Sequence, residues 1–156
     1  MKNISNSIKI LNVARQNFNK LISPFDLSTL NMIPDGFNNN LIWNFGHVIV
    51  TQQLLTYALS GLSTPISKEL IAKYKKGSRP ENEVSQSEVE ELIGLSESLI
   101  PRFVKDYENG LFSSFGPYKT SFGYELTSLE DAIEFNNLHE GMHIGTSIVL
   151  AQRFQK

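Results

Sequence analysis

Two of the three histidines in the chain, His139 and His143, lie four residues apart near its C-terminal end. In an α-helix this spacing turns the second side chain by only about 40° and raises it by about 6 Å, so both imidazoles face the same side. The third, His47, lies in an apolar segment that the sequence predicts to be helical. Three imidazoles on two neighbouring helices can bind a divalent metal ion.

The chemistry of such a site is limited by the absence of cysteine, which excludes disulfides, a cysteine nucleophile and thiolate ligands. No fourth protein ligand accompanies the histidines in the sequence. An open position of this kind is typical of catalytic sites, where water or substrate completes the coordination. We predict a metal site at His47, His139 and His143. Zinc and nickel are the first candidates, and manganese and iron are alternatives.

Polar residues about one helical turn from the histidines are candidates for the lining of a cofactor or substrate pocket. They are Asn44, Thr51, Asn136 and Ser147. Their alternative role is that of ordinary helix surface.

Glycines also interrupt these helices, and each costs about 1 kcal/mol relative to alanine. Close helix packing or access for a ligand would explain them. They are Gly46, Gly141 and Gly145.

The segment from His139 to His143 also matches the H-E-x-x-H pattern, in which a glutamate acts as the general base of a zinc protease. Glu140 is therefore a candidate catalytic base for a metal-activated water. The thirteen residues after His143 contain no His, Asp or Glu, which argues against a zinc-protease fold. In the alternative interpretation Glu140, about 100° round the helix from His139, is a solvated surface acid.

Length and composition place this site in a chain of ordinary type. The 156 residues are 40% hydrophobic, and we expect one domain covering residues 1–156. The net charge of −2 and the absence of a basic run argue against a nucleic-acid partner. There is no run of about 18 apolar residues and no apolar leader segment. We therefore expect a soluble, cytoplasmic protein that does not enter a membrane and acts on a small molecule.

Helical periodicity predicts four long helices, over about residues 5–22, 40–60, 85–109 and 127 to near the end of the chain. A short helical piece over 66–73 lies between the second and third. Pro101 is expected to kink or divide the third helix, and the aromatic, glycine-rich segment 111–126 to fold over one end. With almost no strand signal, the pattern predicts an all-α protein, a four-helix bundle with one long crossover.

The histidine motifs resemble those of the DinB-like superfamily, which includes metal-dependent hydrolases and bacillithiol transferases. The similar segments are Trp43–His47 and His139–Gly145, and the likeness in helix layout covers essentially the whole chain. The resemblance implies an up-down-down-up four-helix bundle, in which His47, His139 and His143 bind a divalent metal. It also implies a homodimer. Apolar residues of the first helix support that assembly, namely Ile10, Val13 and Phe18.

Two classes of function are compatible with these features. In the first, the chain is an enzyme whose metal activates water or a low-molecular-weight thiol for attack on an electrophilic substrate, as in a hydrolase or a thiol S-transferase. In the second, it is a non-catalytic metal-binding module of a stress response. Metal content alone does not separate the two.

Overall fold

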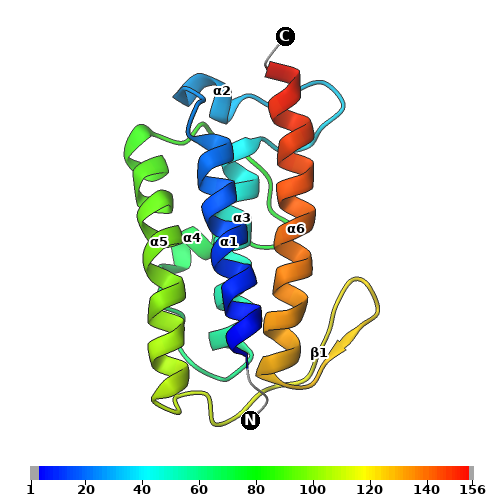
Figure 1. The fold of residues 1–156 in the computed structure, drawn as a ribbon. Helices are drawn as coiled ribbons and strands as arrows, with labels where there is room; N and C mark the ends of the chain where they lie inside the picture. Colours follow the sequence, from blue (N-terminus) through cyan, green and yellow to red (C-terminus); the bar gives the residue numbers. More distant parts are fainter. Residues whose placement is uncertain (1–3, 155–156) are drawn as a thin grey trace.

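The computed structural model describes residues 4–154, so that both ends of the predicted domain, 1–3 and 155–156, lie outside the described residues. Four long helical segments lie side by side (Figure 1). They are α1 (Ser5–Ile22), α3 (Leu41–Gln53) with its continuation η1 (Leu54–Ala58), α5 (Gln86–Glu108) and α6 (Leu129–Phe154). The shorter elements are α2 (Leu27–Asn31), α4 (Lys68–Tyr74), β1 (Tyr118–Lys119) and β2 (Glu125–Leu126). The predicted all-α class is confirmed.

Helix α3 occupies the centre of the fold, as its apolar sequence predicts. Every residue of α3 except Thr51 is buried, and the helix contacts α1, α2, α4, α5 and α6. Helix α6 packs along both α1 and α3. None of the helices in the described part of the chain is both long and apolar enough to span a membrane. The packing places the histidines of α6 beside the histidine of α3.

The limits of the long helices follow from local residue chemistry. The side chain of Asn40 accepts a hydrogen bond from the Trp43 amide at 2.9 Å and so caps the start of α3. Ser85 caps α5 in the same way through the amide of Glu88, at 3.3 Å. Gly61 has a φ of +73° where the chain turns away after η1, a conformation that favours glycine.

Helix α5 differs from the prediction at Pro101, because it is one continuous helix across this residue. A proline inside a helix removes one backbone donor. Buried side chains on both sides of the proline, Ile100 and Phe103, pack into the core. The expected division into two pieces is therefore wrong.

The segment between α5 and α6 forms a small hairpin that projects beside the start of α6 (Figure 1). Tyr118 pairs with Leu126 across its two short antiparallel strands. The backbone N–H of Gly116 donates to the carbonyl of Leu59 at 2.6 Å. The ring of Phe122 packs edge to face on Phe135 of α6, with centroids 5.9 Å apart. The hairpin is thereby attached to the helices that carry the histidines.

Candidate metal centre

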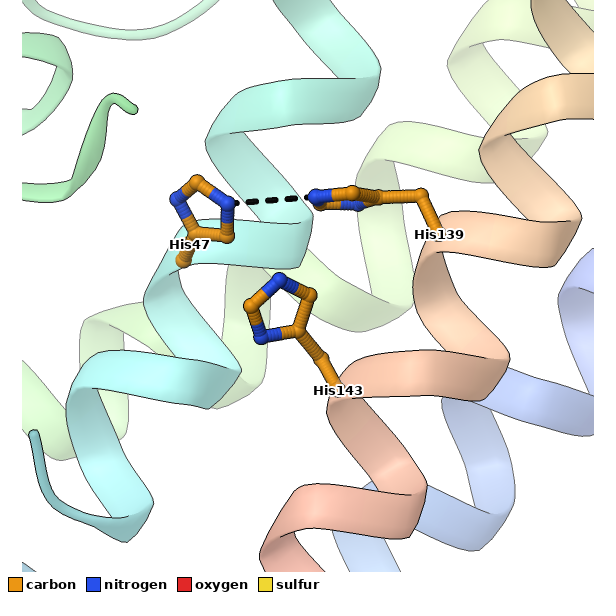
Figure 2. A group of neighbouring side chains, drawn as sticks. All are labelled: His47, His139 and His143. Carbon is orange, nitrogen blue, oxygen red and sulfur yellow. Dashed lines mark hydrogen bonds between the residues drawn. The ribbon is translucent and has the colours of Figure 1, made fainter. Parts of the chain in front are cut away.

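The three histidines converge between α3 and α6, and Figure 2 shows their rings pointing toward one another. One nitrogen from each ring lies within 4.8 Å of the others. The closest pair is Nε2 of His47 and Nε2 of His139, 3.2 Å apart. The rings of His139 and His143 face one side because four residues separate them on α6. The convergence that the sequence predicts is present.

His47 is held from two sides. Its Nδ1 lies 2.6 Å from the carbonyl oxygen of Tyr74, at the end of α4. Because a carbonyl oxygen can only accept, this Nδ1 carries the proton and donates, which leaves a lone pair on Nε2 in the neutral ring. The indole of Trp43 stacks on the imidazole, with centroids 4.7 Å apart and an interplanar angle of 11°. The ring therefore directs Nε2 toward the other histidines.

His143 is oriented by a side chain of α3. Its Nδ1 donates to Oδ1 of Asn44 at 2.8 Å, and the Asn44 amide is itself fixed because its Nδ2 donates to the carbonyl of Asn40 at 2.8 Å. Hydrogen bonds of this kind set the tautomer of metal-binding histidines. Asn44 thus acts through His143, and its side chain is fully buried.

His139 is the least constrained of the three. Its buried Nδ1 has no hydrogen-bond partner among the described residues. Its Nε2 faces Nε2 of His47, which carries a lone pair, at 3.2 Å. Two nitrogen lone pairs at this distance repel unless a proton or a cation lies between them. The donor set therefore suits a cation shared by the three rings.

Electrostatics favour the uncharged imidazoles that metal binding requires. Burial lowers the pKa of His47, against the opposing effect of its hydrogen bond to Tyr74. Burial, and then the charges of His143 and His47, lowers the pKa of His139 to about 3. Burial, and then the charge of His47, lowers the pKa of His143 to about 4. All three rings are neutral near pH 7 and can donate lone pairs.

A cavity of about 380 Å³ opens beside the three rings. Its size is within the range of small-molecule sites, about 300–1,000 Å³. Most of its wall is apolar and comes from η1, α6 and the hairpin. The apolar side chains are Leu54, Leu55, Leu59, Phe122, Phe135 and Met142. Residues 54 and 55 belong to a single π-helical turn, a feature frequent at functional sites that the sequence pattern did not predict.

Of the predicted pocket residues, Thr51 lines the cavity, with its Oγ1 3.4 Å from Nε2 of His47. Asn44, Asn136 and Ser147 are fully buried outside the cavity lining. Asn136 lies near Glu140, with Nδ2 donating to Oε1 at 3.4 Å. The hydroxyl of Ser147 has no partner in the described part of the chain.

Glu140 is fully buried, so the interpretation as a solvated surface acid is wrong. Its carboxylate forms an ion pair with Arg15 of α1 and is not part of the cavity lining. Arg15 also donates to Oε1 of Gln52 at 3.2 Å. Arg15 was not among the predicted site residues, although its position gives a signal: it follows Ile8 and Leu11 at the spacing of the buried stripe of α1.

The glycines near the histidines have different surroundings. A Cβ on Gly46 would lie 2.5 to 2.8 Å from ring atoms of Tyr74, so this glycine allows the tyrosine ring to pack against α3. The expected close approach is therefore found at Gly46. At Gly141 and Gly145 a Cβ would meet no heavy atom within 4 Å, and both lie on the exposed side of α6. The close packing considered for these two positions is not observed among residues 4–154.

Comparison with known proteins gives one result on the family. A family model described as DinB superfamily matches residues 10–147, a span that contains all three histidines. A search of curated proteins found no match.

Proposed function

The chain belongs to the DinB superfamily, and we propose that it is a divalent-metal-dependent enzyme acting on a small electrophilic substrate. His47, His139 and His143 would hold the ion, with zinc or nickel as the first candidates. When bound, a divalent ion at this site would supply a Lewis acid that activates water or a low-molecular-weight thiol as the nucleophile. The reaction would be a hydrolysis or a thiol S-transfer.

One observation carries the proposal: three neutral imidazoles converge at the wall of a cavity large enough for a small molecule. Within the described residues, no Asp, Glu or further His joins this group. The arrangement thus leaves room for a non-protein ligand, as open catalytic sites do and closed structural sites do not.

The residues around the histidines would shape the reaction. The apolar side chains of η1 and the hairpin would exclude water from the substrate and strengthen electrostatic interactions in the cavity. The Thr51 hydroxyl lies next to His47 and can donate or accept a hydrogen bond at the reacting centre. Of the described residues that line the cavity, none carries a carboxylate. This favours a thiol, which needs no strong general base, over water.

The same observation supports the alternative, a non-catalytic metal-binding module of a stress response. Such a module needs the three ligands but no base. The general-base role of Glu140 stays a prediction, and the pairing of its carboxylate with Arg15 counts against it.

Further features belong to the proposal. The side-by-side long helices and their contacts support an up-down-down-up four-helix bundle with one long crossover, formed by a single domain. A homodimer is supported by Ile10 and Val13, which are exposed on α1. Phe18 gives no such support, because it is fully buried in the core. Cytoplasmic localisation remains a prediction from the sequence.

The test is a screen of untagged protein loaded with zinc or nickel. Conjugation of several low-molecular-weight thiols to an electrophile and hydrolysis of activated esters would be measured for wild type, His143→Ala and a matched surface variant of the same helix, Gln152→Ala. We expect turnover in wild type and Gln152→Ala, and a loss of at least about 10²-fold in His143→Ala. A metal-loaded wild type without either activity would favour the binding module.

A further inference from the structure

Among the described residues that line the cavity beside the histidines, Lys76 carries the only charge. The other lining residues are the histidines, neutral in this setting, together with apolar and uncharged polar side chains. Lys76 comes from the connection that follows α4. A single cation at an otherwise uncharged wall is a feature that metal binding by the histidines does not explain.

The backbone around Lys76 is held in place by hydrogen bonds. The amide of Ser78 donates to the carbonyl of Lys75 at 3.1 Å, and Gly77 between them adopts a φ of +87°. The Ser78 hydroxyl donates to the carbonyl of Lys75 at 2.8 Å and accepts from Nε1 of Trp43 at 3.3 Å. The turn that bears Lys76 is thereby fastened to α3.

The same stretch of backbone also orients a histidine. Tyr74, whose carbonyl accepts the hydrogen bond of His47, precedes Lys76 by two residues. The backbone at residues 74–76 therefore positions both the His47 ring and the Cα of Lys76. Only the flexible side chain of Lys76 can change the distance between its ammonium group and the imidazole.

The ammonium group of Lys76 is available to a ligand. The side chain is exposed, and it forms no ion pair with another residue of the described chain, whereas its neighbour Lys73 is paired with Glu88 at 2.6 Å. An anion bound in the cavity would meet Lys76 without displacing an internal partner.

We infer that the cavity takes a small carboxylate with an apolar body, whose carboxylate pairs with Lys76 while the body lies against the leucines and phenylalanines. One lysine neutralises one charge, so a monoanion fits, whereas a dianion such as a phosphate monoester would leave a second charge facing an apolar wall. That this ligand is the substrate rests on the proposed function. The pairing with Lys76 does not, and it can be measured without turnover.

The experiment compares phenylacetate with its neutral isostere phenylacetamide, by chemical-shift titration of isotope-labelled protein treated with a chelator. Wild type, Lys76→Met and Lys75→Met would be titrated. Lys75→Met is the matched control, because it removes an adjacent exposed lysine that does not line the cavity. We expect wild type and Lys75→Met to prefer the carboxylate by about fivefold, as for a partly exposed ion pair. Lys76→Met should bind both probes equally, and the preference of wild type should weaken as salt is added.

Three results would overturn the inference. The first is equal binding of the two probes to wild type, and the second is binding of neither probe at millimolar concentration. The third is a preference that persists in Lys76→Met, since the carboxylate would then be recognised by another group. Failure of the enzyme assays with the Lys76-dependent preference intact would instead count against the proposed function alone.

Discussion

The guanidinium of Arg15 and the carboxylate of Glu140 form an ion pair in which the side chains are only 2% and 0% exposed. Nε of Arg15 lies 3.2 Å from Oε2 of Glu140. Glu140 directly follows His139, so the pair fastens α1 to α6 next to the candidate metal site. The residue that matches the catalytic base of the sequence motif is thus paired with an arginine of another helix.

Replacing Glu140 by glutamine should therefore destabilise the fold. The change leaves the Arg15 charge buried without its counter-ion, and breaking a buried pair in this way costs about 3 to 5 kcal/mol. Urea denaturation would measure the loss in free energy of unfolding. The double variant Arg15→Met, Glu140→Met removes both charges and should recover much of the loss.

Glu140→Gln also distinguishes activation of water by a general base from activation of a thiol by the metal alone. A general base at Glu140 predicts a fall in turnover of about 10² to 10⁴ in Glu140→Gln with the metal retained. From the position of the carboxylate we expect turnover per folded molecule to change little. A fall of that size in folded, metal-loaded protein would restore the general-base role. An unchanged free energy of unfolding would contradict the buried pair.

Much of this site could be predicted because helical periodicity fixes which side chains share a face. The spacing of His139 and His143 places their rings together, and the apolar sequence around His47 places that residue in the central helix. In each case the relevant information lies within a few residues of the chain.

The remaining features depend on contacts between distant segments. His47 donates its hydrogen bond to the backbone carbonyl of Tyr74, an acceptor that any residue type could supply. Lys76 reaches the cavity only because of the path of the connection after α4. The carboxylate of Glu140 can be buried because Arg15 of the neighbouring helix α1 lies beside it and forms an ion pair with it. The spacing of residues along one helix does not indicate any of these contacts between distant segments.

Asn44 should control metal affinity through His143. Its Oδ1 accepts the Nδ1–H of that ring at 2.8 Å, and loss of such a partner typically weakens metal binding about 10- to 100-fold. We expect this loss in Asn44→Leu, measured by competition with a chromophoric chelator. Asn44→Asp keeps the acceptor for His143 but loses the donor to the Asn40 carbonyl, so its metal affinity should lie between those of wild type and Asn44→Leu. Equal affinity in all three proteins would show that this hydrogen bond does not matter.

Gly46→Ala should be destabilising, because the added Cβ would overlap the ring of Tyr74. This ring is buried, and its hydroxyl donates a hydrogen bond to Glu88. Overpacking of this kind costs about 1 to 3 kcal/mol. Metal affinity should fall as well, since the Tyr74 carbonyl holds His47. Gly94→Ala is the matched control, because its Cβ would meet open space. Alanine at this helical position should raise the free energy of unfolding by as much as about 1 kcal/mol. Similar stabilities for the two variants would contradict the close contact.

The proposed homodimer should involve the exposed apolar side chains of α1 and α6, two helices that pack together. These side chains are Ile10, Val13, Leu138, Ile148 and Val149. We expect Val13→Glu to raise the dissociation constant at least ~10-fold, because it would bury a charge at the interface. Lys20→Glu, an exposed change on the same helix, should have little effect. Wild type that sediments only as a monomer at tens of micromolar would contradict the dimer.

Metal analysis of protein purified without a histidine tag tests the central claim most directly. Protein incubated with zinc or nickel and then desalted would be compared with His47→Ala, His143→Ala and Gln152→Ala. We predict one divalent ion per chain in wild type and in Gln152→Ala, and little or none in either histidine variant. Wild type without bound metal, or histidine variants that keep a full equivalent, would contradict a metal site at His47, His139 and His143.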